Sequence, residues 1–345
     1  MLKKRVIVTG GAGFIGSALV RKLLQEENTS IMNIDNLTYA GNLNSIPTEL
    51  MNTNYQFIQQ DICDQDVMEN LMNSFKPNLI IHLAAESHVD RSIDSPVNFL
   101  KTNILGTFSL LEASRKYWQN LKGIKAENFR FLHISTDEVF GDLEGKEDYF
   151  TESNPYAPSS PYSASKASSD HLVRAWHRTY GLPILISNCS NNYGPYQFPE
   201  KLIPVIVLNA ISGLEIPIYG TGTQIRDWLF VDDHVRALMK IATKGSVGSS
   251  YIIGGGNEIS NIELANKVCE ILENFEINKP KGVVSYFNLI THIDDRPGHD
   301  QRYAVDCTKI KEELGWIPKE SFDTGLNKTI NWYINNLSWV SKTLT

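Results

Sequence analysis

Two adjacent carboxyl groups lie at the end of an apolar stretch, in the segment Ser-Thr-Asp-Glu-Val-Phe-Gly at 135–141. The apolar run before it is typical of a buried strand. In a continuous strand neighbouring side chains point to opposite faces, so Asp137 and Glu138 share a site only if the strand ends at Thr136. Two close carboxylates do not ionise together cheaply, which would keep one protonated as a general acid beside an ionised general base. A solvated turn is the alternative.

A tyrosine and a lysine form a second chemical pair. Tyr162 and Lys166 stand just inside an expected helix, after a proline-rich loop. Their spacing places both side chains on one helical face, with β-carbons about 6 Å apart. The ammonium is expected to lower the pKa of the phenol and make it a usable base. A surface pair without chemistry is the alternative.

Three glycines follow the first expected strand and open the first helix. Gly10, Gly13 and Gly16 have the spacing that permits a tight turn and close approach of a pyrophosphate to a helix N-terminus. Asp35 ends the second strand, where this pattern places an acid that binds the adenosine ribose. That acid would repel a 2′-phosphate, so the pattern predicts NAD and not NADP. A glycine turn without a ligand is the alternative.

The elements that must position these groups alternate between strands and helices. Apolar strands at 5–10, 30–35, 55–62, 78–85, 129–136 and 183–194 are separated by helical patterns that begin at 14, 64, 96 and near 162. Such alternation predicts an α/β fold, with a Rossmann-type doubly wound parallel sheet. After about residue 195 shorter strands and helices predict a smaller mixed α/β C-terminal substrate domain. We expect the two domains to interleave, as 1–194 plus about 227–254, and 195–226 plus 255–345.

Asp61 has two interpretations. With Ile62 it borders the adenine of a bound dinucleotide, or it caps the helix expected over 64–75.

The composition excludes several classes of function. The chain has 345 residues, 42% of them hydrophobic, and a formal charge of -7 with no basic run, which argues against nucleic-acid and anionic-membrane partners. No apolar stretch predicts a membrane span or a signal peptide. The four cysteines have no metal-binding spacing, so we expect neither a metal nor disulfides, and a reducing cytoplasm.

Taken together, the glycine loop, the Ser/Thr at a strand end and the Tyr162-x-x-x-Lys166 pair resemble the extended short-chain dehydrogenase/reductase superfamily. Within it, seven segments resemble the dTDP-glucose 4,6-dehydratases: DNLTYAGNL, LAAESHVDRSI, STDEVFG, PYAPSSPYSASKA, NNYGPYQFPEKLIP, GTQIRDWLFVDDH and DDRPGHDQRYA. The similarity runs from about residue 5 to beyond 316. Related epimerases share the fold and the Tyr/Lys pair but lack the Thr-Asp-Glu triplet. Asn36 and Phe140 depart from the pattern, which has Lys and Tyr there.

The resemblance implies a closed hydride cycle with tightly bound, recycled NAD. Tyr162 would take the proton of the sugar C4 hydroxyl while the C4 hydride passes to NAD, and Thr136 would bind the C4 oxygen. Glu138 would remove the C5 proton as general base and Asp137 would protonate the leaving C6 hydroxyl. Return of the hydride to C6 and of a proton to C5 gives a 4-keto-6-deoxy sugar. The alternatives are another nucleotide-sugar dehydratase, a 4-epimerase, and a non-catalytic NAD sensor.

The resemblance also assigns binding residues. Those for the cofactor are Gly10, Gly13, Phe14, Ile15, Gly16, Asp35, Asn36, Leu37, Thr38, Asp61, Ile62, Leu83, Ala84, Ala85, Ser87, Thr102, Tyr162, Lys166 and Asn192. Those for the dTDP-glucose substrate are Ser87, Thr136, Asn191, Lys201, Leu202, Pro217, Tyr219, Arg226, Asn261, Arg296, His299 and Tyr303. Lys201, Arg226 and Arg296 carry the charge that a diphosphate needs, with surface ion pairs as the alternative. For His88, a purely structural role is the alternative to ligand binding.

The helical segment 96–118 places five apolar residues at helical spacing: Val97, Leu100, Ile104, Phe108 and Leu111. Packing against the sheet is the expectation from the pattern alone. The resemblance implies that this segment and the Tyr162 helix form a homodimer interface.

Overall fold

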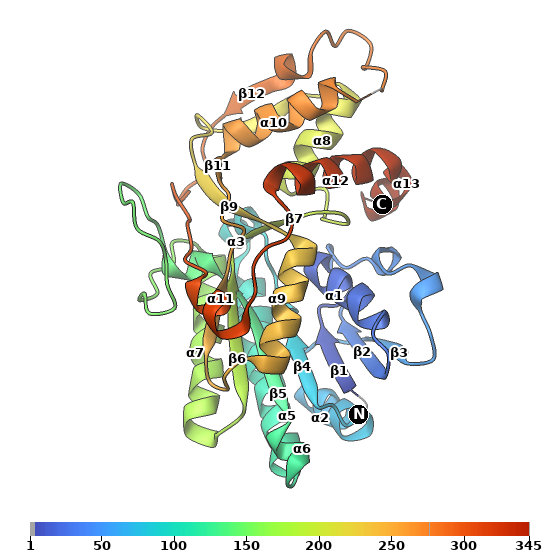
Figure 1. Cartoon of the computed structure of the whole chain (residues 1–345), viewed down its shortest axis with the longest axis vertical. Coiled ribbons are helices and arrows are strands. Elements are labelled where there is room, and N and C mark those ends of the chain that lie inside the picture. The colour runs from blue at the N-terminus through green and yellow to red at the C-terminus, as the bar shows by residue number, and fades with distance from the viewer. Residues whose placement is uncertain (1–3, 276, 345) are drawn as a thin grey trace.

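Seven parallel strands form one large sheet in the computed structural model, which describes residues 4–275 and 277–344 (Figure 1). Their order across the sheet is β10-β6-β5-β4-β1-β2-β3. The strands span β1 Lys4–Thr9, β2 Thr29–Asp35, β3 Tyr55–Gln59, β4 Leu79–His82, β5 Arg130–Thr136, β6 Ile184–Cys189 and β10 Ser250–Ile253. The strand order reverses direction between β1 and β4, which is where ligands of doubly wound sheets bind. The predicted α/β Rossmann-type fold is confirmed.

Helices cover both faces of this sheet because its strands are apolar on both sides. In β1, Val6 and Val8 pack under one set of helices and Ile7 under the other. The first set is α1 Phe14–Leu24, α9 Val231–Lys244 and α11 Thr308–Leu314. The second set is α2 Gln65–Phe75, α5 Thr107–Gln119 and α7 Pro161–Tyr180. The two layers hold the carboxyl ends of the strands at one rigid edge.

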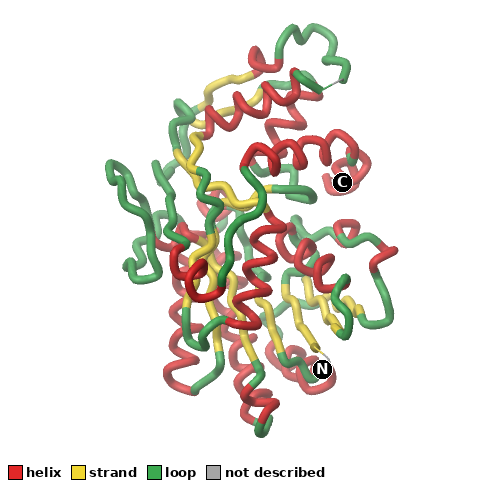
Figure 2. The backbone as a smooth tube through the Cα atoms, in the orientation of Figure 1, coloured by secondary structure: helices red, strands yellow, loops and turns green. Residues whose placement is uncertain are grey.

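A second, smaller region lies above the large sheet in Figure 1 and mixes short strands with helices (Figure 2). Its strands are β7 Asn191–Tyr193, β9 Ile225–Phe230 and β11 Glu258–Ser260 in one sheet, and β8 Ile216–Tyr219 and β12 Ile290–Ile293 in another. Its helices are α8 Leu202–Ser212, α10 Asn261–Glu273, α12 Phe322–Asn335 and α13 Leu337–Leu344. Buried aromatic residues such as Tyr193, Trp228 and Tyr333 fill its core.

The predicted boundaries between the two domains remain a prediction, because some elements pack in the cores of both regions. Along β9, Leu229 packs in the core of the large sheet, whereas Trp228 and Phe230 pack in the core of the smaller region. Ile310 and Trp316, expected in the second domain, pack in the core under the large sheet. The reason is that α11 contacts β10 and α9.

The segment expected as one helix over 96–118 is divided into three parts. These are α4 Pro96–Phe99, the π-helical turn η3 Leu100–Gly106, and α5. Leu111 is fully buried as predicted, but the expected core packing of three others is wrong, because Val97 is 70% exposed, Leu100 48% and Phe108 39%. The short helices α3 Val89–Asp94 and α6 Ile124–Glu127 flank this segment.

Membrane-spanning helices are not found in the described ranges, since none of the helices there is both long and apolar enough.

Candidate active site

The strand before the acid pair ends at Thr136, as it must if Asp137 and Glu138 are to share a site. β5 ends at Thr136, and Asp137–Phe140 form a single 3₁₀ turn, η4. The Thr136 hydroxyl caps this turn: it accepts a hydrogen bond from the Glu138 N–H (3.3 Å) and donates one to Asp137 Oδ1 (3.2 Å). Both carboxyl groups consequently line one cavity of about 330 Å³, together with Tyr162 and Lys166.

The two carboxyl groups meet different surroundings although they are neighbours in the chain. Burial raises the pKa of Asp137 well above its usual value, and the charges of Glu138 and Asp227 raise it further. Asp137 Oδ2 is also buried without a hydrogen-bond partner in the described part of the chain. Burial raises the pKa of Glu138 as well, but three cations oppose that rise: Arg296, Arg226 and Lys201. Arg226 also opposes the rise for Asp137, so Arg296 and Lys201 make the difference. The surroundings therefore favour the proton on Asp137 over a proton on Glu138.

Helix α7 presents Tyr162 and Lys166 to the same cavity. It begins with a capping box between Ser160 and Ser163, with a proline at its first position, so the register of the following residues is fixed. Lys166 Nζ donates a 2.7 Å hydrogen bond to the Ile134 carbonyl oxygen on β5. Burial lowers the pKa of Lys166 to about 8, and this effect outweighs the opposing charge of Asp170.

The predicted lowering of the Tyr162 pKa is wrong for this structure. Burial raises that pKa well above 10, and the charges of Glu138 and Asp137 add to the rise, while a hydrogen bond with Thr136 opposes it. The Lys166 ammonium is directed to the Ile134 carbonyl oxygen. Tyr162 and Lys166 thus share one helical face as predicted, but the pKa of Tyr162 depends on what else fills the cavity.

The glycine loop forms a cradle that fits a dinucleotide. Gly10 has a φ of +72°, and a β-carbon there would lie 2.6 Å from the Ala84 nitrogen. A β-carbon on Gly16 would lie 2.0 Å from the Gly10 carbonyl oxygen. Asp35 braces the loop by accepting hydrogen bonds from the N–H groups of Ala12 (2.9 Å) and Leu37 (2.8 Å). Its oxygens retain lone pairs for the hydroxyls of a ribose.

Asp61 is not the helix cap, so that interpretation is wrong. The cap of α2 is Asp64, whose side chain accepts a hydrogen bond from the Val67 N–H. Asp61 instead accepts a bond from the Cys63 N–H (2.9 Å) and lines the cavity beside Ile62.

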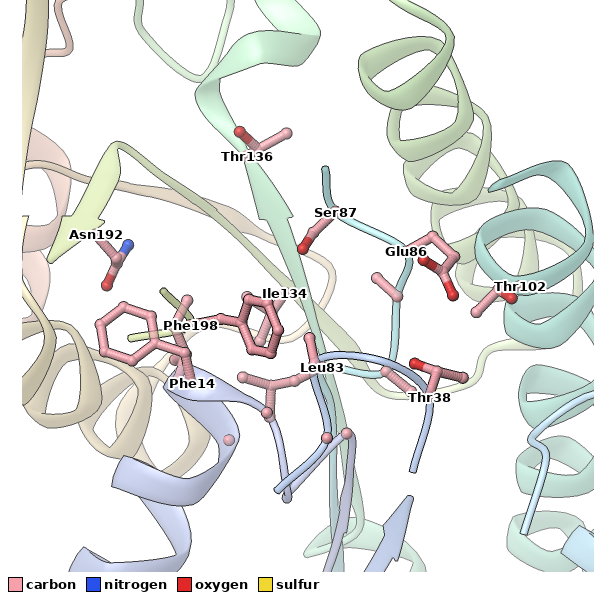
Figure 3. Close-up of a pocket in the computed structure, with 18 of the residues that line it drawn as sticks. Phe14, Thr38, Leu83, Glu86, Ser87, Thr102, Ile134, Thr136, Asn192 and Phe198 are labelled. Atoms are coloured by element: carbon pink, nitrogen blue, oxygen red, sulfur yellow. The ribbon is translucent and has the colours of Figure 1, made fainter. Parts of the chain in front are cut away.

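Most of the predicted binding residues come together around this cavity, and Figure 3 shows how they approach it from separate elements. The lining includes Gly10, Gly13, Phe14, Ile15, Gly16, Asp35, Asn36, Thr38, Asp61, Ile62, Leu83, Ala84, Ala85, Ser87, Thr102, Asn191, Asn192 and Lys201. Thr136 lies at the end of its strand, with Asn192 and Ser87 on opposite sides of the view (Figure 3).

Nine predicted residues do not line the cavity: Leu37, Leu202, Pro217, Tyr219, Arg226, Asn261, Arg296, His299 and Tyr303. Leu37 is held through its backbone to Asp35. Leu202 and Asn261 begin α8 and α10, and Pro217 belongs to β8. Their roles as ligand contacts remain predictions.

The remaining members of that group contact residues outside the cavity lining. Tyr219 Oη (3.3 Å) and Arg296 Nη1 (3.0 Å) both donate to the Asp90 carboxylate. Arg226 donates to the Asp300 carbonyl oxygen (2.8 Å) and stacks on the Tyr303 ring. His299 Nδ1 lies 2.6 Å from Asp295. His88 has a structural role, because its ring caps helix α3 by accepting a hydrogen bond from the Arg91 N–H.

Sequence reasoning missed a clamp over the cavity. Tyr39, Phe198 and Glu200 all line it. Arg91 lies over the Tyr39 ring, 3.6 Å from its centroid, and pairs with Glu200 at 3.2 Å. Tyr39 meets Phe198 edge to face at 5.5 Å. Tyr39 and Phe198 fall inside two of the quoted segments, but no spacing in the sequence indicates that these segments meet.

Comparison with known proteins then decides the family. The family model described as GDP-mannose 4,6 dehydratase matches residues 7–329. The chain belongs to that family. It is 58% identical over 336 residues to a dTDP-glucose 4,6-dehydratase of Neisseria meningitidis, with 97% of this chain and 95% of the relative covered. The resemblance to dehydratases of the extended short-chain dehydrogenase/reductase superfamily is thereby confirmed.

Solved structures of the family share the whole architecture. The dTDP-glucose 4,6-dehydratase of Bacillus anthracis in complex with NAD superposes with a TM-score of 0.87 at 41% identity, with 99% of each chain covered. The UDP-glucose 4-epimerase of Thermotoga maritima with UDP-glucose gives a TM-score of 0.82 at 31% identity, covering 96% and 99% of the two chains. The fold is therefore common to dehydratases and epimerases, and only the site separates the two activities.

Proposed function

We propose that this chain catalyses the NAD-dependent dehydration of dTDP-glucose to dTDP-4-keto-6-deoxyglucose. One observation carries the proposal: Asp137 and Glu138 leave the strand together and line one cavity with Tyr162, in surroundings that favour opposite protonation states. An acid and a base on one face are what elimination of water requires. A 4-epimerase has no use for either group.

The chain's residues divide the proton transfers among them. Tyr162 accepts the proton of the C4 hydroxyl, which requires that its pKa fall when cofactor and substrate fill the cavity, and the Thr136 hydroxyl holds the C4 oxygen. Once C4 is a ketone, the neighbouring C5–H is acidic enough for Glu138 to remove it. Asp137 then gives its proton to the departing C6 hydroxyl from the unpartnered Oδ2. NAD, when bound in the glycine cradle, would supply the remaining chemistry by storing the C4 hydride and returning it to C6, while a proton returns to C5.

Three cations support binding of a nucleoside diphosphate. Lys201 lines the cavity, and the charges of Arg226 and Arg296 lower the pKa of Glu138. Guanidinium groups suit bidentate phosphate contacts, so we assign Arg226 and Arg296 to the diphosphate and Lys201 to the sugar side.

Product analysis with three substrates tests the proposal. The purified protein is incubated separately with dTDP-glucose, UDP-glucose and GDP-mannose, and the products are identified by NMR. We expect a 4-keto-6-deoxy sugar from dTDP-glucose, with deuterium placed at C4 recovered at C6 of the same molecule. A product with inverted C4 and an intact C6 hydroxyl would identify an epimerase. No turnover with NAD bound would favour the sensor.

We also propose a homodimer through the segment that was expected to pack in the core. Val97, Leu100, Leu105 and Phe108 expose apolar surface on η3 and its flanks, beside α7. Several large exposed apolar side chains on one segment are typical of a protein interface. Light scattering on Leu105→Glu, with Leu214→Glu as the exposed control from the other region, would show a shift to monomer in the first variant alone.

A reducing cytoplasm is the compartment we propose, because all four cysteines are free and Cys189 and Cys269 are buried.

A further inference from the structure

A buried carboxylate on α7 has no part in the proton transfers above. Asp170 follows Lys166 by one helical turn and is completely buried. Its Oδ2 accepts hydrogen bonds from Ser135 Oγ (2.8 Å), Tyr156 Oη (2.8 Å) and Asn188 Nδ2 (3.3 Å). A carboxylate that is removed from water persists only where donors and an opposite charge compensate it.

The opposite charge is not that of the neighbouring histidine. His133 Nε2 lies 3.2 Å from Asp170 Oδ1, but burial and then the Lys166 charge lower the pKa of His133 to about 4. The imidazole is therefore neutral at neutral pH. Arg174 reaches Asp170 only through the Tyr156 hydroxyl, at 3.0 Å. Against burial, which raises it, the hydrogen bond and charge of His133, and then the charge of Lys166, lower the pKa of Asp170. Because His133 is neutral at neutral pH, the lasting positive charge near Asp170 is that of Lys166, one helical turn away.

Lys166 in turn has few anions near it. Cys189 lies beside it, and burial raises the pKa of that thiol to about 12, so it carries no charge. His82 and His133 are also close, and burial keeps both neutral. Asp170 is thus the anion next to Lys166 in the described part of the chain.

The same carboxylate is tied to the end of β5. Ser135, which donates to Asp170, directly precedes Thr136. Asn188 Nδ2 donates both to Asp170 and, at 3.1 Å, to the Thr136 carbonyl oxygen. Hydrogen bonds from Ser135 and Asn188 therefore connect Asp170 to the point at which β5 ends and η4 begins.

We propose that Asp170 is a positioning residue, which keeps Lys166 charged beside Tyr162 and holds the strand end that presents Thr136, Asp137 and Glu138. This inference rests on the proposed function only for the roles of Lys166 and Tyr162 in turnover. The buried charge pair itself is independent of it.

The pH dependence of turnover tests the electrostatic part. In Asp170→Asn the Lys166 ammonium loses its counter-charge, so the basic limb of the turnover profile should move to lower pH by roughly one unit or more. Tyr156→Phe is the matched control, because it removes a donor to the same oxygen and leaves the charge. The basic limb of the Tyr156→Phe profile should stay at the wild-type pH. An unmoved limb in Asp170→Asn, or an equal shift in Tyr156→Phe, would overturn the proposal.

Thermal unfolding provides a readout that needs neither activity nor a folded Asp170→Asn variant. In Lys166→Met, Asp170 loses its cation and its folded-state pKa rises. An acid with a raised folded pKa costs stability above that pKa, so the deficit in Tm relative to wild type should shrink as the pH falls from 7 to 5. A deficit that is the same at every pH would refute the charge pair, whatever reaction the enzyme catalyses.

Discussion

The guanidinium of Arg91 in helix α3 lies over the ring of Tyr39, 3.6 Å from its centroid, although Tyr39 belongs to the loop after β2. Arg91 also pairs with Glu200, which follows the strand β7. Tyr39 and Glu200 line the cavity, whereas Arg91 is the outer link between them. We therefore expect the Arg91 contacts to slow the release of a dinucleotide from this cavity.

Arg91→Ala should therefore release NAD faster. A half-exposed cation–π contact contributes about 0.5–1 kcal/mol and an exposed ion pair up to about 1 kcal/mol, so a dissociation rate raised roughly tenfold is expected. Stopped-flow displacement of NAD measures it. Arg115→Ala is the control, since Arg115 also pairs with an acid, Glu112, and lies over a ring, Tyr180, far from the cavity. Equal rates in the two variants would contradict the clamp.

Glu138→Gln should separate the two halves of the reaction. Oxidation at C4 uses Tyr162 and is retained, but the C5 proton has no base, so loss of water should slow by about 10²–10⁴-fold. Enzyme-bound NADH should accumulate, and its absorbance in a single turnover is the measurement. Glu147→Gln, in the exposed segment 144–149, should behave as wild type. Dehydration at the normal rate in Glu138→Gln would remove the assignment of the base.

Sequence reasoning located the groups but not their charges. The glycine spacing, the strand end at Thr136 and the Tyr162–Lys166 register are local features, and the structure has them where the residues indicate. The difference between Asp137 and Glu138 depends on Arg296 and Lys201, which are distant in the chain. No local pattern contains that information.

The wrong expectations have equally physical causes. Helical spacing identifies an apolar stripe on 96–118 but does not say whether a sheet or another protein covers it. The π-helical turn η3 also changes the register of the face, so Leu111 is buried while Leu100 and Phe108 are exposed. The pKa of Tyr162 was predicted from its lysine alone, whereas burial and the acid pair dominate it.

Gly10→Ala should cost both stability and cofactor binding. The new β-carbon would lie 2.6 Å from the Ala84 nitrogen, in backbone that cannot yield without moving β4. A loss of more than about 3 kcal/mol in the free energy of unfolding is expected, measured by urea denaturation with and without NAD. Gly145→Ala isolates the backbone term, because Gly145 has a similar φ of +67° with open space around it. It should lose only about 1–2 kcal/mol.

Asp137→Asn should be inactive in dehydration yet more stable than wild type at neutral pH. The folded-state pKa of Asp137 is raised by burial and by Glu138, so the folded protein binds a proton that the unfolded chain releases. Wild-type stability must then fall as the pH rises from the unfolded pKa of about 3.9 toward the folded one, and asparagine removes that dependence.

The gain in Tm for Asp137→Asn should be on the order of a few degrees at pH 7–8 and should vanish toward pH 4. Scanning calorimetry across that range, with the exposed Asp294→Asn as the control, measures it. A gain that persists unchanged at pH 4 would point to packing and not to the proton. Loss of stability at pH 7 would mean that Asp137 is ionised in the folded protein, and the roles of Asp137 and Glu138 would have to be exchanged.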